Sequence, residues 1–387
     1  MFSDRTNWNL EPNRLSEALA QHRAARRRLI DLTASNPTEC GFAYDGQAIL
    51  RALGNPLAFA YEPQTKGLAS ARQAVAGYYA GLGIELSIED VILTTSTSEA
   101  YSYIFRALCN PGDEILIPEP SYPLFDFLAD IEDVKLVRYQ LLYDHGWQID
   151  FRSVERGITP KTRALMVVHP NNPTGHFVKA DEAERLREWS ASRGLAIVAD
   201  EVFLDFGLDF DEQRARSFAH NSVALTFTLS GLSKIAGLPQ MKVAWMVASG
   251  PSTLKKSALD RLEVIADTYL SMNAPVQHAI PELLAGRTAF QAQMLNRVHA
   301  NLRELDRQLH LTTFCTRLTI EGGWYAVLRI PVTSSDEEFA VSLLVKKGVY
   351  VHPGHFYGFH GDGHLVVSLI VPEGDFAEGI RALLEVF

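Results

Sequence analysis

The sequence lacks several features that mark particular classes of protein. It has only three cysteines in 387 residues, Cys40, Cys109 and Cys315, and their spacing matches neither a zinc ribbon nor a disulfide framework. The first residues contain neither the basic start nor the apolar core of a signal peptide, and the longest apolar runs are too short to span a bilayer. We therefore expect a cytoplasmic protein that does not enter membranes.

Positive charge is also scarce. The 36 lysines and arginines are outnumbered by 46 acidic residues, which gives a formal net charge of −10. Such a chain has no general positive field that would attract nucleic acids or anionic lipids. The sequence also contains no GxGxxG fingerprint, Walker loop or GxSxG elbow, which argues against the commonest nucleotide-binding enzymes and serine hydrolases.

From about residue 68 onward, short apolar or β-branched runs alternate with helical stretches. The expected strands are 91–94, 114–117, 135–139, 164–168, 196–199, 223–228 and 243–247. Strands separated by helices form a largely parallel sheet with helices on both faces. The sequence therefore predicts an α/β protein built on a mainly parallel, seven-stranded sheet.

The pattern changes from about residue 280. A long helix is expected over 288–309, a strand begins after Gly322 and Gly323, another helix covers 336–347, and a strand covers 365–370. We interpret this region as a smaller α+β domain that includes the N-terminal arm. The predicted division is a large domain of residues 45–279 and a small domain of residues 1–44 and 280–387.

The most unusual residues follow the ends of the expected strands, where open α/β sheets form ligand crevices. Ser96, Thr97 and Ser98 begin a helix and offer hydroxyls and backbone N–H groups to an anion. Tyr122 lies in a proline-rich turn and offers an aromatic face, while Asn172 projects from the turn 169–175. Taken singly, each has a plainer explanation as a helix cap, a packing residue or a turn residue.

Two charged residues complete the set. Asp200 ends an apolar strand, where an isolated buried carboxylate is costly unless it finds a partner. Lys234 follows the next expected strand and lies between apolar neighbours. Hydroxyls for a phosphate, an aromatic for a ring, an amide and a carboxylate for polar ring atoms, and a lysine for an aldehyde are together what pyridoxal phosphate requires.

The chain resembles the class I/II aminotransferases, which are fold-type I pyridoxal phosphate enzymes related to aspartate aminotransferase. The resemblance is strongest at residues 61–72, 171–175, 200–203 and 233–234. It implies that Lys234 forms the internal aldimine and acts as the catalytic base, and that Asp200 pairs with the protonated pyridine nitrogen. The other residues that it implies as cofactor contacts are Asn172, Tyr122, Ser96, Thr97, Ser98, Phe203, Ser233, Lys242 and Tyr61.

Tyr61 is expected to reach the cofactor of a partner subunit. The resemblance therefore also implies a homodimer with shared active sites.

Four positions depart from the family pattern. Phe203 replaces a usual tyrosine, Gly231 replaces a phosphate-binding serine beside Ser230, and Lys242 replaces a phosphate-binding arginine. Val366 stands where an arginine usually binds the substrate carboxylate. We therefore predict a modified substrate pocket, with Asn36, Trp324 and Arg329 as candidate contacts.

Four histidines lie around a glycine-rich loop near that strand: His352, His355, His360 and His364. They lack acidic or cysteine companions at ligand spacing, so we expect a polar loop beside the pocket and no metal site.

The predicted function is transfer of an amino group from an amino acid or amine to a 2-oxo acid. A lyase, or another non-transferring pyridoxal phosphate enzyme on the same scaffold, is the alternative. A cofactor-binding protein without turnover is a third possibility, against which the intact Lys234, Asp200 and Asn172 argue.

Overall fold

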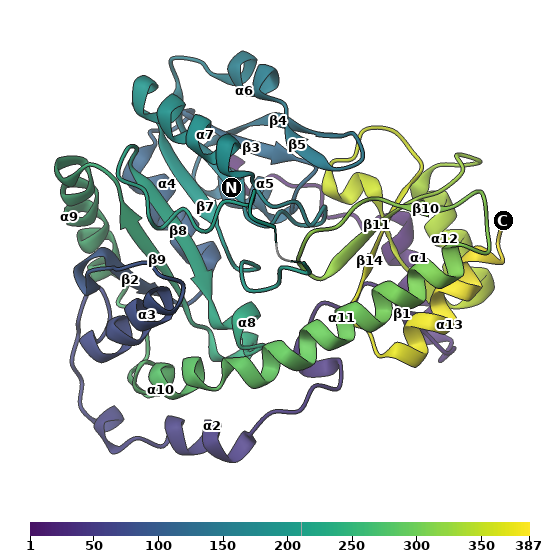
Figure 1. The fold of residues 1–387 in the computed structure, drawn as a ribbon, viewed down its shortest axis with the longest axis horizontal. Coiled ribbons are helices and arrows are strands. Elements are labelled where there is room, and N and C mark those ends of the chain that lie inside the picture. The colour runs from purple at the N-terminus through teal and green to yellow at the C-terminus, as the bar shows by residue number, and fades with distance from the viewer. Residues whose placement is uncertain (210) are drawn as a thin grey trace.

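The computed structural model describes residues 1–209 and 211–387, and its largest element is an eight-stranded mixed sheet (Figure 1). The strand order is β2-β9-β8-β7-β6-β3-β4-β5. The strands are β2 (Val91–Thr94), β3 (Glu114–Glu119), β4 (Lys135–Tyr143), β5 (Trp147–Ile149), β6 (Thr162–Val168), β7 (Ala196–Asp200), β8 (Thr226–Gly231) and β9 (Ala244–Ser249).

The strands β8, β7, β6, β3 and β4 run parallel to one another. β9 runs antiparallel to both β8 and β2, and β5 folds back against the end of β4. The α/β prediction is confirmed, with β5 as a short strand in addition to the seven expected.

Helices cover both faces of this sheet because its strands are apolar on both sides. One face packs against α4 (Thr97–Leu108), α5 (Leu124–Ile131) and α9 (Ser252–Tyr269). The helices on the other face are α2 (Gly46–Leu53), α3 (Ala69–Gly81), α6 (Phe151–Gly157), α7 (Ala180–Arg193), α8 (Leu232–Ile235) and α10 (Ala274–Ala285).

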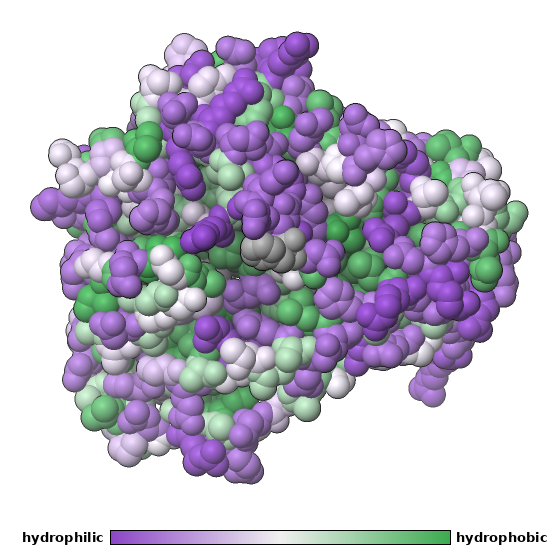
Figure 2. Space-filling view, viewed as in Figure 1, coloured by the Kyte–Doolittle hydropathy of each residue, from purple (hydrophilic) through white to green (hydrophobic). Residues whose placement is uncertain are grey.

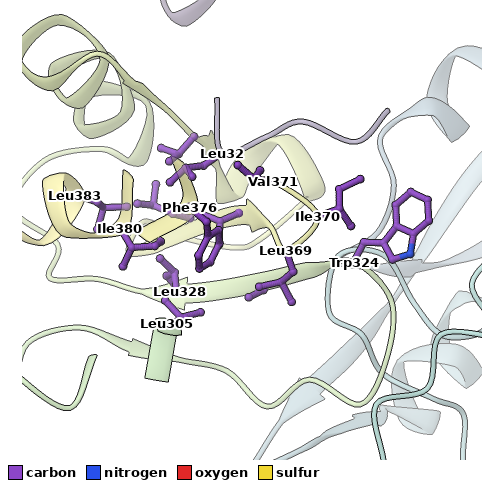
Figure 3. Close-up of a cluster of buried hydrophobic side chains, with 14 of the residues drawn as sticks. Leu32, Leu305, Trp324, Leu328, Leu369, Ile370, Val371, Phe376, Ile380 and Leu383 are labelled. Carbon is purple, nitrogen blue, oxygen red and sulfur yellow. The ribbon is translucent and has the colours of Figure 1, made fainter. Parts of the chain in front are cut away.

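A second core lies around a four-stranded antiparallel sheet of order β10-β11-β14-β13. Its strands are β10 (Thr316–Arg317), β11 (Tyr325–Arg329), β13 (His352–Pro353) and β14 (His364–Ser368). The helices around it are α1 (Arg14–Ala24), α11 (Arg287–Leu309), α12 (Asp336–Lys347) and α13 (Glu373–Leu384). Figure 3 shows Phe376, Ile380 and Leu383 of α13 near Leu328 of β11 in this core.

The remaining elements are short. β1 (Ile30–Asp31) pairs in parallel with β12 (Val349–Tyr350) and so ties the N-terminal arm to the second core. The 3-10 helices are η1 (Asp4–Thr6), η2 (Pro37–Glu39), η3 (Pro56–Phe59), η4 (Ile88–Asp90), η5 (Pro239–Met241) and η6 (Gly354–Tyr357).

The surface drawn in Figure 2 is mainly hydrophilic, with apolar residues in smaller groups. Within the described residues, no helix combines the length and apolar character needed to cross a bilayer.

Two glycines bring the turn after β6 against the segment that leads into β11. Gly175 has a positive φ of 70°, and a Cβ placed on it would lie 2.6 Å from the carbonyl oxygen of Gly322. A Cβ on Gly322 would lie 2.8 Å from the carbonyl oxygen of Phe206. Side chains at these positions would therefore push apart the segments that connect the two sheets.

Gly175→Ala should lower the free energy of unfolding by about 2 to 4 kcal/mol, because it combines left-handed backbone strain with a clash against main chain. Gly83 is the matched control, since its φ is 76° and nothing lies within 4 Å of an added Cβ. Gly83→Ala should therefore cost only about 1 to 2 kcal/mol. Chemical denaturation followed by circular dichroism measures both, and equal losses would rule out the backbone contact as a determinant of stability.

Candidate active site

A cavity of about 290 Å³ lies at the C-terminal ends of β6, β7 and β8. Open α/β sheets bind ligands at this edge because the loops that follow neighbouring parallel strands converge there. The residues predicted from the sequence that line it are Ser96, Thr97, Ser98, Tyr122, Asn172, Asp200, Phe203, Ser233 and Lys234. Folding thus gathers side chains from five separate segments around one space.

Lys234 lies in the short helix α8, directly after β8. Its Nζ atom is 4.8 Å from the ring centroid of Trp324 and 5.6 Å from that of Phe203. Burial lowers the pKa of Lys234 to about 8, against the opposing effect of the Asp200 charge. With this pKa, roughly a tenth of the amine is unprotonated at pH 7, and that form acts as a nucleophile or a base.

Asp200 ends β7 and is 8% exposed. Its Oδ2 atom accepts a hydrogen bond from the Tyr101 hydroxyl at 2.6 Å, and its Oδ1 atom accepts one from the backbone N–H of Val202 at 3.0 Å. Burial raises the pKa of Asp200, while these two donors and the Lys234 charge oppose the rise. A cationic group in the cavity would therefore meet a carboxylate already fixed in direction.

The acidic residue next in the chain points away from the cavity. Glu201 is 1% exposed and accepts hydrogen bonds from the Ser217 hydroxyl at 2.7 Å and the Phe218 N–H at 2.6 Å. Successive side chains of a strand point to opposite sides, so only one of this acidic pair can face the site. Burial raises the pKa of Glu201 to about 8.

Two features make the cavity suitable for a phosphorylated heteroaromatic ring. The Oδ1 atom of Asn172 is buried and has no hydrogen-bond partner within the described residues. Ser96 caps α4, where the first N–H groups of the helix have no intrahelical acceptor. A helix N-terminus with adjacent hydroxyls binds anions. The unpaired Oδ1 atom of Asn172 can accept a hydrogen bond from a polar group on a ring.

Several predicted residues lie outside the lining. Tyr61 is 81% exposed and borders a different cavity, whose lining includes residues 60–65 and 270–274. Lys242 is exposed, and Arg329 is exposed with its guanidinium carbon 5.7 Å from the centroid of the Tyr143 ring. Asn36 caps η2 through Thr38, while its neighbour Ser35 does line the cavity.

Trp324 is fully buried and does not line the cavity, although its ring lies 4.8 Å from the Lys234 Nζ atom and 5.2 Å from the Phe203 ring. Figure 3 shows its indole at the edge of the second core. Val366 is 1% exposed on β14, where it pairs with Val327 of β11. Of the cavity-lining residues in the described part of the chain, Lys234 alone is cationic.

Gly231 also lines the cavity, and steric contact explains why it has no side chain. A Cβ at this position would lie 2.8 Å from the carbonyl oxygen of Val243. Its neighbour Ser230 is 1% exposed, does not line the cavity, and has a hydroxyl without a partner in the described structure.

The histidines around the glycine-rich loop contact different groups. The Nε2 atom of His360 lies 2.9 Å from Glu119, and the Nδ1 atom of His352 lies 3.1 Å from the Tyr357 hydroxyl. Among residues 1–209 and 211–387, no group of three or more His, Cys, Asp or Glu side chains is arranged to hold a metal.

Sequence reasoning missed three polar residues of the lining: Tyr101, Ser35 and Tyr325. Tyr101 lies one helical turn after Thr97, so the helical repeat alone would have placed it on the same face. Tyr325 follows Trp324 at the start of β11, and burial raises the pKa of its hydroxyl to about 12, while a hydrogen bond with Ser35 opposes that rise. Nothing in the local sequence links Ser35 to Tyr325, because only the tertiary fold brings them together.

Comparison with known proteins gives a consistent result. The family model for aminotransferase class I and II matches residues 47–383. The chain is 28% identical to the glutamate-pyruvate aminotransferase AlaA of Haemophilus influenzae, over 92% of this chain and 90% of that protein. It is also 28% identical to the alanine aminotransferase of Mycobacterium bovis, over 94% of this chain and 86% of that protein.

Among solved structures, the alanine aminotransferase of Pyrococcus furiosus superimposes with a TM-score of 0.89 at 22% identity, covering 100% of this chain and 99% of that one. At that identity the likeness supports the fold alone. Taken together, the family and curated relatives support transamination and give no support to the lyase alternative.

Glu201 should make the stability of the protein depend on pH. Its ordinary pKa of 4.5 applies to the unfolded chain, whereas the folded value is about 8. Because the folded state holds the proton more tightly, this contribution to stability is complete below about pH 4.5 and is lost as the pH rises through 8. Glu201→Gln cannot ionise, so its free energy of unfolding should fall less than that of the wild type across this range.

The expected difference between the two pH profiles is on the order of 1 to 3 kcal/mol, measured by urea unfolding at a series of pH values. Glu188→Gln, a change at an exposed position on α7, is the control and should follow the wild type. Parallel profiles for wild type and Glu201→Gln would show that this carboxyl does not titrate as described.

Proposed function

Because the chain belongs to the aminotransferase class I and II family, we propose that its cavity binds pyridoxal 5'-phosphate and that Lys234 and Asp200 are the catalytic residues. The enzyme is an aminotransferase, and the proposal concerns how this chain performs the transfer. The observation that carries it is that a lysine of lowered pKa and a buried, oriented carboxylate line the same cavity.

Each end of the cofactor has a matching group. The amine of Lys234 would bind the aldehyde carbon, and Asp200 would accept a hydrogen bond from the protonated pyridine nitrogen. Asn172 would contact the ring hydroxyl and Tyr122 the ring face. The phosphate would lie against the N-terminus of α4, with Ser96, Thr97, Ser98 and Ser233 as its contacts.

When bound, the cofactor supplies a conjugated ring that accepts the electron pair left at the substrate carbon after a proton is removed. Lys234, once displaced by the substrate amine, would take that proton, and a pKa lowered to about 8 suits a base that works near neutral pH. The same Nζ, then protonated, would serve as the acid that gives the proton back. Asp200 would keep the pyridine nitrogen protonated, so that the negative charge can spread into the ring.

We also propose the wider assembly that the family resemblance implies. Residues 45–279 would bind the cofactor, and residues 1–44 and 280–387 would form the smaller domain. The protein would work as a cytoplasmic homodimer, in which the exposed Tyr61 reaches the cofactor of the other subunit. An amino donor and a 2-oxo acid acceptor would be its partners.

Lys234→Ala should abolish covalent attachment of the cofactor. After incubation with pyridoxal phosphate and reduction with borohydride, the wild type should carry the cofactor on the peptide that contains residue 234. The variant should carry none there and should transaminate at least about 100-fold more slowly, since it lacks the base. Lys256→Ala, at an exposed site on α9, is the control. Mass spectrometry that found the adduct on another lysine would refute the assignment.

The specificity for the amino donor should reflect the lining of the cavity, in which Lys234 is the one cation among the described residues. Given the names of its relatives, the first amino donors to test are alanine and glutamate, and the first acceptors are pyruvate and 2-oxoglutarate. Because Val366 supplies no charge, alanine should exceed ethylamine by less than the roughly 100-fold that two charge-assisted hydrogen bonds would give. Absorbance of the cofactor during the half-reaction measures both rates. A larger preference for alanine would mean that a cationic group binds the carboxylate.

A further inference from the structure

Tyr101 occupies a position in the cavity that the proposed mechanism does not yet use. Its hydroxyl donates to Asp200 Oδ2 at 2.6 Å, and the two residues are 2% and 8% exposed. The other oxygen of Asp200 is held by the Val202 N–H at 3.0 Å. Both carboxylate oxygens are therefore fixed before any ligand binds, one by the backbone of its own loop and the other by a side chain from a different element.

The Tyr101 ring is itself held firmly. It packs edge-on against Phe125 at a centroid distance of 5.3 Å and lies 6.1 Å from Phe105. Tyr101 belongs to α4, whose capping residue Ser96 and first residues line the same cavity. A single rigid helix therefore supplies the candidate phosphate contacts and, one turn later, a hydrogen bond to the carboxylate.

The charges around the pair favour this hydrogen bond. Burial and the Asp200 charge raise the pKa of Tyr101 well above its ordinary value, so the phenol stays protonated and donates. The other titratable groups that interact with Asp200 are Lys234, which favours its ionised form, and Glu201 and Tyr122, whose pKa values the Asp200 charge raises. Without the phenol, Oδ2 would have no donor within the described residues.

We propose that Tyr101 is a positioning residue: its hydroxyl holds the Asp200 carboxylate ionised and aimed at the pyridine nitrogen of the cofactor. This inference rests on the proposed function, because it assumes that pyridoxal phosphate binds with its nitrogen at Asp200. Tyr101 does not touch the reacting atoms, and it acts only through the carboxylate.

The test compares two cofactors in two proteins. Tyr101→Phe removes the hydroxyl and keeps the ring. It should weaken binding of pyridoxal phosphate about tenfold, since a hydrogen bond to a charged group is lost. Binding of an analogue with carbon in place of the pyridine nitrogen should change little, because it has nothing to pair with Asp200. The ¹⁵N resonance of labelled cofactor should also shift toward the unprotonated form in the variant.

Tyr103→Phe is the matched control. Tyr103 lies on the same helix and is also 2% exposed, but its ring stacks on Tyr269 and borders the other cavity. It should bind both cofactors as the wild type does.

Each outcome is informative. Equal weakening of both cofactors by Tyr101→Phe, or an unchanged ¹⁵N signal, would overturn the positioning role and assign Tyr101 a purely structural one. A wild type that fails to bind pyridoxal phosphate would instead refute the proposed function itself.

Discussion

The structure of this site is governed by the cost of burying the Asp200 carboxylate at the end of a central strand. An isolated charge in that environment would take up a proton instead of remaining ionised. Two hydrogen bonds and the nearby Lys234 amine compensate for part of that cost. Burial in the same apolar enclosure lowers the pKa of Lys234 and so favours the unprotonated amine, whereas for Asp200 its effect has to be opposed by the two hydrogen bonds and the lysine charge.

That enclosure exists because two separate cores meet around it. Phe203 and Phe206 follow β7 of the large sheet, yet they pack with Trp324 in the core of the smaller sheet. Backbone hydrogen bonds from Leu208 to Glu321 and from Gly323 to Phe206 join the two segments. The aromatic wall beside Lys234 is therefore part of the connection between the two sheets. A substitution that loosens this connection would also change the environment of the lysine.

The sequence predicted what depends on local pattern. Continuous apolar runs identified the buried strands, and the residues after them identified most of the cavity, because strand ends converge whatever the details of packing. It could not identify Tyr101 as the partner of Asp200, since that pair is 99 positions apart and the tyrosine resembles any core aromatic of α4. Lys242 is a different case: its spacing from Lys234 matches the family, whereas its side chain is exposed and lies outside the lining, and a local sequence pattern does not give the direction of a side chain after a turn.

The departures from the family share a physical consequence. Phe203, Gly231 and Val366 each put an apolar or absent side chain where the family usually has a polar one, and the cavity retains Lys234 as its single cation among the described residues. Neutral polar groups remain: the Asn172 Oδ1 atom can accept a hydrogen bond, and the Tyr325 phenol, whose pKa is raised to about 12, can donate one but cannot provide charge. Under the proposed function, such a wall would recognise a substrate by hydrogen-bond geometry and shape. Discrimination between amino donors should then depend on how well the whole substrate fits against Tyr325 and Ser35, and less on its carboxylate alone.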